Sequence, residues 1–467
     1  MTYKLSPILA GLALITAAPP APQRAAAAPD EITAALPVIP GSKFNLLDYG
    51  AKGDGKTLNT EAFKSAVAAI AKAGGGHLIV PAGIFKTLPF VLTSHMDLNL
   101  EAGAIIKAPD TFEEYGIPNP NLPHSAQAMP QTGGRAGSGT GWVAPLISCP
   151  AGTTDLAITG AGVIDGSGAM FWMWSDKAAR SYPPGRAVVP RPVLVSLPGV
   201  ERLHVDGITL TNSPAFHLAP SGQDITIENL RIVAPSDSPN TDALDPGGQR
   251  IVIRKCELDT GDDNVALKNG GHDILIEDLT CLHGHGISIG SATRNGFSHI
   301  VVRRCTFDGT DNGLRIKSDR GNGGEVHDIR FSDIAMKNVR RPFDINMLYN
   351  GNAGLATDVG PRQAEPGQTQ NIPNFHDIHV SNLTVTRSPL AGRIIGLPEQ
   401  IANAISFTNL KIQSTRGFLI QDGKDIVFEN ARIDVAIGES LVLDNASVKW
   451  NGTQKSGSSG GPPDAFY

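Results

Sequence analysis

The sequence predicts an all-β solenoid, in which short strands stack coil upon coil around one apolar core. Runs of alternating apolar and polar residues recur mostly at intervals in the twenties, and such self-similarity is typical of stacked coils. The 52 glycines suit a fold with many tight corners. Eight runs carry the same inward ladder: residues 225–227, 251–253, 274–276, 300–302, 329–331, 378–380, 405–407 and 426–428.

At the amino end, residues 1–28 have the pattern of a secretory signal peptide. Lys4 precedes a short apolar run from Ile8 to Ala18, and Ala25–Ala28 offers small residues for cleavage. This run is too short to span a bilayer. We therefore expect an exported protein, secreted or periplasmic, that has no membrane contact after cleavage. An uncleaved anchor is the alternative.

Residues 44–85 are predicted to form a cap on the first coil. A helical pattern runs from Thr60 to Ala73, and a strand is expected over His77–Val80. The glycines between 50 and 55 lack the strand–glycine–helix order and the lysine of phosphate-binding loops. The segment is therefore expected to cover the open end of the apolar core.

Residues 29–450 are predicted to form one domain, because the inward ladder is long enough for a single continuous core and no second domain is visible. Segments 109–142 and 351–373 are polar and rich in glycine and proline, so they are expected to be surface loops. Residues 451–467 are of low complexity and are expected to form a flexible tail.

Two tryptophans and four cysteines are assigned packing roles. Trp172 and Trp174 lie in a further loop, where they could stack on a sugar, but packing within the loop is the preferred interpretation. The cysteines show no metal-ligand spacing, and free, buried thiols are preferred. They are Cys149, Cys256, Cys281 and Cys305. The sequence predicts neither a metal nor a cofactor.

The net charge narrows the choice of partner. A formal charge of −6 argues against nucleic acid, because neutralising phosphates needs a basic face. The same charge is unfavourable for any polyanionic substrate. Binding of such a substrate must therefore depend on a local cationic patch rather than on the overall field.

Four polar segments interrupt the strands at matching positions. Asp242, Asp263 and His285 each lie two residues before the first large apolar residue of a run, and Asn312 does the same. The differences between these numbers are 21, 22 and 27. Stacked coils would therefore bring the segments to one corner. The segments are Asn240-Thr241-Asp242, Gly261-Asp262-Asp263, Gly284-His285-Gly286 and Arg315-Ile316-Lys317.

These segments resemble the signature set of glycoside hydrolase family 28, the polygalacturonases. The resemblance includes Asn212-Ser213-Pro214 and the runs 262–268 and 313–319, and it spans roughly residues 44 to 435. It departs at Ala243, where the family often has glycine. The resemblance implies a right-handed parallel β-helix with an N-terminal helical cap, pectin as the polysaccharide partner, and no cofactor. A monomer is expected.

Glycosidic bond cleavage needs one carboxylic acid to protonate the leaving oxygen and one carboxylate on the other side. The resemblance implies that Asp262 is the acid and that Asp242 and Asp263 activate water. Adjacent like charges do not ionise easily together, so one pKa is expected to rise. The resemblance also implies that His285 hydrogen-bonds within the cluster; it is preferred over His283 because it holds the repeat position. Each aspartate alone could instead be a turn residue that caps backbone N–H groups.

The remaining candidate residues would bind substrate. Arg315 and Lys317 alternate on one strand, so both are predicted to face outward, where a fork donor and a point cation suit a sugar carboxylate. A solvated charge pair is the alternative. Asn240 is expected to contact substrate or to orient Asp242. Tyr349 falls where the family carries a substrate-contacting tyrosine.

The sequence therefore predicts inverting hydrolysis of α-1,4-galacturonosidic bonds in polygalacturonate, with endo action favoured. Exo action, or another pectic hydrolase of the same family, is the alternative, and the loops 109–142 and 351–373 would decide by closing or opening one end of the groove. A pectate lyase would need an acidic calcium cluster and a basic residue for proton abstraction. A non-catalytic β-helix binding module is a third possibility.

Overall fold

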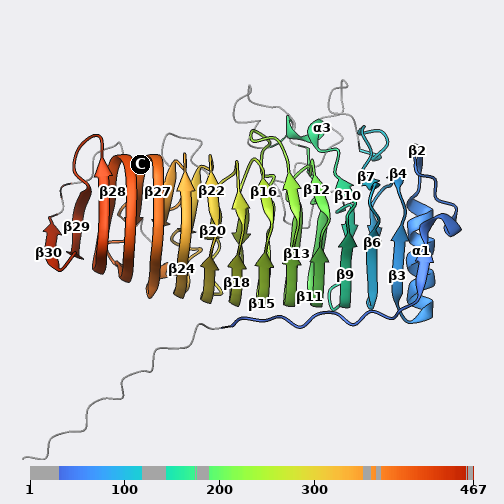
Figure 1. The fold of residues 1–467 in the computed structure, drawn as a ribbon, viewed down its shortest axis with the longest axis horizontal. Helices are drawn as coiled ribbons and strands as arrows, with labels where there is room; N and C mark the ends of the chain where they lie inside the picture. Colours follow the sequence, from blue (N-terminus) through green and yellow to red (C-terminus); the bar gives the residue numbers. More distant parts are fainter. Residues whose placement is uncertain are drawn as a thin grey trace, which may run out of the picture. The chain divides into compact units, whose positions relative to one another are not determined.

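The computed structural model describes residues 31–117, 144–173, 175, 189–350, 359–363, 370–458, 460 and 466. Residues Ile32–Tyr467 form one compact unit. The predicted signal peptide, Trp174 and most of the two predicted loops lie outside the described residues. The unit is a right-handed parallel β-helix with one helix of 14 residues near its amino end (Figure 1), so the predicted fold class is confirmed.

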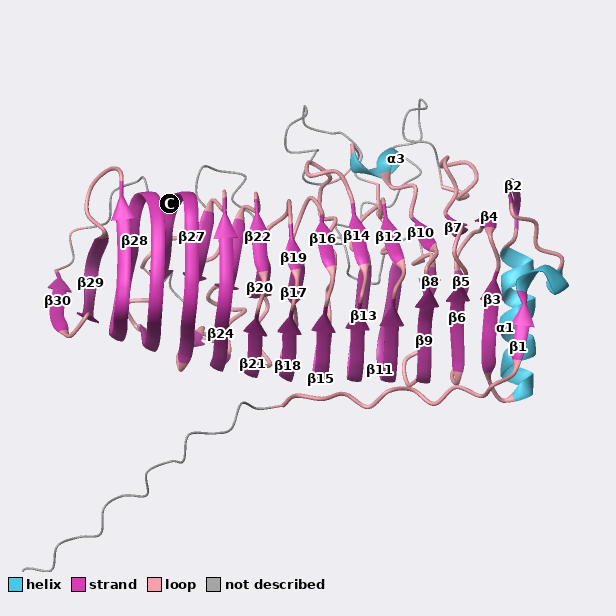
Figure 2. Ribbon diagram, in the orientation of Figure 1, coloured by secondary structure: helices cyan, strands magenta, loops and turns pink. Residues whose placement is uncertain are grey.

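Each full coil contributes strands to three parallel stacks (Figure 2). The first stack begins on β1 (Lys43–Asn45), which pairs with β3. It contains β3 (Gly76–Val80), β6 (Met96–Leu100), β9 (Thr154–Gly160), β11 (Val195–Asp206), β13 (Leu218–Glu228), β15 (Gly247–Arg254), β18 (Gly271–Glu277), β21 (Phe297–Arg303), β24 (Glu325–Lys337), β26 (Asn374–Phe375), β27 (Ile378–Ile395) and β28 (Ala402–Val435).

The second stack continues each coil after a corner. It contains β2 (Asp54–Leu58), β4 (Gly83–Lys86), β7 (Ala104–Lys107), β10 (Val163–Asp165), β12 (Thr209–Thr211), β14 (Arg231–Val233), β16 (Glu257–Asp259), β19 (Thr280–Cys281) and β22 (Thr306–Asp308). The third stack contains β5 (Phe90–Val91), β8 (Ile147–Ser148), β17 (Val265–Leu267), β20 (Ile287–Gly290), β23 (Asn312–Lys317) and β25 (Arg341–Asn346). Parts of β11, β13, β27, β28 and β29 (Leu441–Trp450) complete it.

The predicted inward ladder is confirmed along the first stack. Ile225 pairs with Ile251, and the register continues through Ile274, Ile300, Ile329, Ile378 and Ile405. All of these side chains are buried. Isoleucine suits this position because its branched side chain packs well on a pleated, buried surface, and each buried aliphatic side chain stabilises the fold by about 1.5–3 kcal/mol.

Single residues in the left-handed conformation turn seven successive coils, from Asn229 to Asn409, from the first stack toward the second. Their φ angles lie between 53° and 59°. Asparagine and aspartate tolerate this conformation best because their short side chains can bond locally, and five of the seven corner residues are of these types. The corner residues are Asn229, Lys255, Asp278, Arg304, Asp333, Asn382 and Asn409.

The helix of the amino-terminal cap has the predicted bounds, and the strand after it begins at Gly76, one residue before the predicted start. Helix α1 (Thr60–Ala73) follows a 3-10 turn, η1 (Leu46–Tyr49). Its Phe63 ring stacks on Phe90 of the first full coil, with ring centroids 4.5 Å apart. None of the described helices has the length and hydropathy that crossing a bilayer requires.

The segment before the cap lies along the outside of the first stack (Figure 1). Ile32 packs on Val252, Leu275 and Val301, which point away from the core on three successive coils. Farther along, the Val38 N–H donates to Asp155 Oδ1 at 3.0 Å. This segment covers apolar side chains that would otherwise be exposed.

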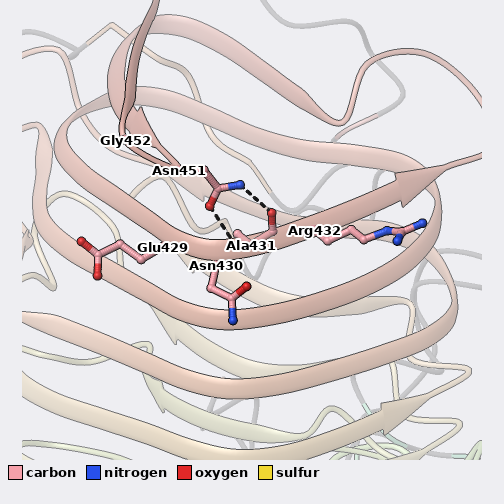
Figure 3. A pocket seen from close by; sticks show the side chains of 6 residues that line it. All are labelled: Glu429, Asn430, Ala431, Arg432, Asn451 and Gly452. Carbon is pink, nitrogen blue, oxygen red and sulfur yellow. Dashed lines mark hydrogen bonds between the residues drawn. The ribbon is translucent and has the colours of Figure 1, made fainter.

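The carboxyl end differs from the predicted flexible tail. Strand β30 (Thr453–Gly457) pairs antiparallel with β29 through a tight turn at Asn451 and Gly452, which both have positive φ. The hairpin forms because such a turn matches the strand twist, and β30 covers the outer edge of β29. Figure 3 shows the shallow hollow beside this turn, where Asn451 bonds both backbone groups of Ala431.

The four cysteines are free and buried, as predicted. Burial raises the pKa of the Cys149 thiol to about 11, and of Cys256 and Cys305 to about 12. Such thiols are unreactive at neutral pH. They are therefore packing residues of the solenoid core.

Candidate active site

The third stack brings the four sequence segments together. Leu244 bridges to Val265, which pairs with Ile287, which in turn pairs with Leu314. This is the alignment that the spacing of the segments predicts. The residues two positions earlier therefore lie at the same corner of successive coils: Asp242, Asp263, His285 and Asn312.

The glycines around His285 are required by the neighbouring coils. A Cβ at Gly286, whose φ is 74°, would lie 2.2 Å from the carbonyl oxygen of Asn312. A Cβ at Gly284, whose φ is 116°, would lie 2.5 Å from the carbonyl oxygen of Asp262. These glycines allow backbone to pack against backbone, and this packing fixes the height of His285 relative to the aspartates.

Asp262 and His285 form the accessible part of the cluster. His285 Nδ1 lies 2.9 Å from Asp262 Oδ1. The same oxygen accepts from the backbone N–H of Asp263 at 3.0 Å. The side chains of His285 and Asp262 are 29% and 10% exposed, against 3% for Asp263. A large ligand would therefore meet Asp262 and His285 first. The predicted contact of His285 with the carboxylates is present.

Asp263 is buried among cations. Its Oδ2 lies 2.7 Å from Lys317 Nζ, and its Oδ1 accepts from Ser288 Oγ at 3.0 Å. Burial alone would raise the pKa of this carboxyl, but Lys317, with His285 and Arg315, outweighs both burial and Asp262, so the pKa of Asp263 is lowered. Asp263 is therefore an ionised carboxylate.

Asp242 is buried in a different setting. Its Oδ2 accepts from Lys268 Nζ at 2.9 Å, and Asp245 Oδ2 accepts from the same ammonium at 2.6 Å. Burial, followed by the charges of Asp245, Asp262 and Asp263, raises the pKa of Asp242 well above its ordinary value, against the effect of Lys268. The sequence predicts a raised pKa within the adjacent pair Asp262 and Asp263. The structure instead raises the pKa of Asp242 and lowers that of Asp263, because Lys317 stabilises the Asp263 charge.

Arg315 and Lys317 do not face open solvent as a simple outward pair would. Both side chains are buried, and Lys317 is engaged by Asp263. The Arg315 guanidinium lies over the ring of Tyr349, 4.9 Å from its centroid, and Lys317 Nζ lies 5.4 Å from the same centroid. The structure thus gathers Arg315, Lys317 and Tyr349 beside Asp263. These are three of the four residues predicted to bind substrate, and they lie on the coils that follow Asp263.

A fully buried ion pair supports Arg315 from behind. The Arg315 Nε lies 3.5 Å from Asp344 Oδ2. Arg393 donates two hydrogen bonds to the Asp344 carboxylate, at 2.7 and 3.1 Å, and one to the carbonyl oxygen of Phe466 at 3.3 Å. Asp344 and Arg393 have no exposed surface. This chain of contacts limits the positions that Arg315 can take.

Asn240 lies at the edge of the site in the left-handed conformation, with φ 54°. Its Oδ1 accepts from Arg191 Nη2 at 2.8 Å. Arg191 also donates to the carbonyl oxygens of Pro214 and Pro239. Trp172 is close by, because its Nε1 donates to the carbonyl oxygen of Ser213 at 3.0 Å, which agrees with the packing role predicted for it.

Ligand atoms of Asp262, Asp263 and His285 lie within 4.8 Å of one another, the spacing that a metal ion needs. These three side chains do not favour a metal cation, because the Lys317 ammonium already contacts Asp263. Outside the site, His204, Asp206 and Glu228 have similar spacing, but Arg254 already pairs with Glu228. The absence of a metal from the reaction stays a prediction.

Several residues that contact the predicted site residues were not identified from the sequence. Lys268 lies inside a motif run and Asp245 lies three residues after Asp242, yet neither holds the repeat position. Asp344 and Arg393 belong to apolar runs, where a charged residue in a buried strand is the one signal that could have found them.

Comparisons with known proteins identify the family of this chain. A family model described as glycosyl hydrolases family 28 matches residues 140–362. The probable polygalacturonase of Vitis vinifera is 30% identical over 387 residues, which cover 79% of this chain and 74% of that protein. The chain belongs to glycosyl hydrolase family 28. It is therefore a glycoside hydrolase, as its sequence motifs predict.

Two further polygalacturonases are similar to this chain along most of their length. The endo-polygalacturonase of Pectobacterium carotovorum subsp. carotovorum is 29% identical over 352 residues, covering 73% of this chain and 80% of that protein. The crystal structure of a hyperthermoactive exopolygalacturonase from Thermotoga maritima matches with a TM-score of 0.66 and 26% identity, covering 91% and 95% of the two chains.

Proposed function

We propose that this family 28 enzyme is a polygalacturonase that hydrolyses α-1,4-galacturonosidic bonds of pectin with inversion. The observation that carries the proposal is the gathering of Asp242, Asp262, Asp263 and His285 beside Arg315 and Lys317. Acids for bond cleavage and cations for a sugar carboxylate thus lie at one corner of the coils. The names of the similar proteins point the same way.

In this mechanism Asp262 is the general acid. It is the most exposed of the three aspartates, so it can reach the leaving oxygen. His285 contacts its Oδ1 and would supply or retain the proton between turnovers. Protonation of the leaving oxygen while the bond breaks lowers the energy of the oxocarbenium-like transition state.

Asp242 and Asp263 would activate the attacking water. A base accepts a proton better when its pKa is closer to the working pH, and the raised pKa of Asp242 meets this condition. Asp263 remains ionised beside Lys317 and would orient the water and balance the positive charge that develops on the sugar. The proton of the water therefore passes to Asp242 in this account.

Arg315 and Lys317 would recognise the galacturonate carboxylate. The stacking of Arg315 on Tyr349 and its contact with Asp344 hold the guanidinium in place, so little side-chain freedom is lost on binding. Neutral sugars offer no charge to this pair, and galacturonate is therefore the favoured unit. Asn240 would contact the chain at the edge of the site.

Endo action is favoured within this proposal. Exo action is kept as the alternative because both kinds of enzyme occur among the similar proteins. The enzyme would act outside the cytoplasm as a monomer, after removal of residues 1–28. Amino-terminal sequencing of the mature protein would test that removal.

Digestion of polygalacturonate tests the function. We expect reducing ends to appear without added calcium and in the presence of EDTA, and a ladder of oligomers to precede mono- and digalacturonate. Asp262→Asn should lower kcat by at least about 10²-fold, with an unchanged thermal unfolding midpoint. Release of mono- or digalacturonate alone would establish exo action, and no release by the wild type would reject the proposal.

A further inference from the structure

Lys268 contacts the Asp242 carboxylate directly and has no role in the mechanism described so far. Its Nζ lies 2.9 Å from Asp242 Oδ2 and 2.6 Å from Asp245 Oδ2. The ammonium also lies 4.0 Å from the centroid of the Phe216 ring. Two carboxylates and an aromatic face thus contact one cation whose side chain is 30% exposed, and these contacts limit the positions that the ammonium can take.

The fold places this group directly behind the proposed base. Lys268 follows β17, whose Ala266 N–H donates to the carbonyl oxygen of Leu244 at 2.8 Å. Asp242 and Asp245 flank Leu244 in the chain. The backbone of Asp242 is also fixed, because its carbonyl oxygen accepts from the buried His217 ring at 3.1 Å. Strand pairing therefore sets the distance between Lys268 and both carboxylates.

The two carboxyl groups are only partly satisfied. Asp242 Oδ1 and Asp245 Oδ1 are buried and accept no hydrogen bond from the described residues. Buried polar atoms without a partner are rare, and a buried negative charge is costly unless it is compensated. The single ammonium of Lys268 is the main compensation available to this pair.

We propose that Lys268 is a positioning residue for the hydrolysis, and that with Asp245 it holds the Asp242 carboxylate in place and in its charged form. The inference rests on the proposed function, in which Asp242 takes the proton of the attacking water. Asp245 is the second anchor of Lys268 and has no contact with the reacting atoms in this account.

The charges that face Asp242 have opposite effects. Burial and the carboxylates of Asp245, Asp262 and Asp263 favour its protonated form, whereas Lys268 favours the ionised form. The nearby His217 is neutral, because burial lowers its pKa to about 4, and it contacts the backbone of Asp242. Removing Lys268 should therefore protonate Asp242, while removing the charge of Asp245 should help it to ionise.

The pH dependence of kcat/KM on polygalacturonate tests this pair of opposite effects. The acidic limb reports loss of the ionised base. We expect Lys268→Met to move it upward by about 1 to 3 pH units and Asp245→Asn to move it downward. Lys268→Arg should keep the limb near its wild-type position. Lys411→Met, an exposed lysine on β28, is the matched control and should leave the whole profile unchanged.

The inference would be overturned if the acidic limb of the pH profile stayed in place in Lys268→Met. It would also be overturned if the limb moved in the same direction in Lys268→Met and in Asp245→Asn. Thermal unfolding midpoints of the variants separate misfolding from altered titration. A second measurement does not need substrate: the carboxyl carbon of Asp242, assigned by its absence from Asp242→Asn, is titrated by NMR. The same opposite shifts are expected there, and equal titration in wild type and Lys268→Met would reject the inference even if polygalacturonate proves to be the wrong substrate.

Discussion

At the scale of single residues, three aspartates of one cluster have different surroundings. Asp263 faces Lys317 and Ser288, Asp242 shares Lys268 with Asp245, and Asp262 contacts His285 nearer the surface. Chemically identical side chains are thereby prepared for different tasks. The difference comes from neighbours on adjacent coils, since all three side chains belong to similar turns.

This difference predicts opposite effects on stability. The lowered pKa of Asp263 contributes stability above its unfolded pKa, which is lost as the pH falls through its folded value. The raised pKa of Asp242 contributes stability below its unfolded pKa, which is lost as the pH rises through its folded value. At pH 7, Asp263→Asn should therefore destabilise the protein by about 3–5 kcal/mol, and Asp242→Asn should stabilise it.

Urea unfolding at pH 7 and pH 4 measures both effects. The gap between the two variants should narrow at the lower pH, because the Asp242 carboxyl, with its raised pKa, is then closer to its protonated form, while Asp263 stays ionised. Shifts of the two midpoints in the same direction at pH 7 would show that the surroundings of these aspartates have been assigned wrongly.

Substrate recognition makes a separate prediction. Arg315→Ala combined with Lys317→Ala should raise KM for polygalacturonate by on the order of 10²-fold, because two charge-assisted contacts to carboxylate are lost. Lys337→Ala, an exposed lysine on β24 that pairs with Asp308, is the control. If the double variant kept the KM of this control, the carboxylate would have to bind elsewhere.

At the scale of elements, periodic features could be predicted and exceptions could not. The bounds of α1 follow from the helical spacing of its apolar residues. The isoleucine ladder and the alignment of Asp242, Asp263 and His285 follow from the coil-length repeat of the sequence. Arg393 lies in register with Asp344, but its role could not be predicted, nor could those of Lys268 and Asp245, because the partner of each lies on another coil. The hairpin of β29 and β30 was missed because a polar segment of low complexity gave no strand pattern.

The buried pair between β25 and β27 gives a prediction for element packing. Arg393→Met should lower the free energy of unfolding by about 3–5 kcal/mol, because Asp344 is then left as a buried charge whose main partner is gone. Adding Asp344→Leu should recover most of that loss. Arg432→Met, whose side chain is 78% exposed, should change stability by less than about 1 kcal/mol. A similar small change in Arg393→Met would mean that the pair is not a structural tie.

At the scale of the whole molecule, stacking converts distance along the chain into closeness in space. Each coil contacts mainly its neighbours, so a solenoid can vary at its ends while one corner keeps its arrangement. Lys317 and Asp263 are 54 residues apart in sequence and 2.7 Å apart in space. The acids, the imidazole and the cations belong to one site only because successive coils are in register.

Proton NMR of the first products from polygalacturonate tests the central claim most directly. If Asp262 protonates the leaving oxygen while water attacks from the opposite face, the α-linkage must first give a β-anomeric reducing end, before mutarotation. The wild-type enzyme should show this β signal early, and Asp262→Asn should show none. An α-anomer formed first, or an unsaturated product, would contradict inverting hydrolysis at this site.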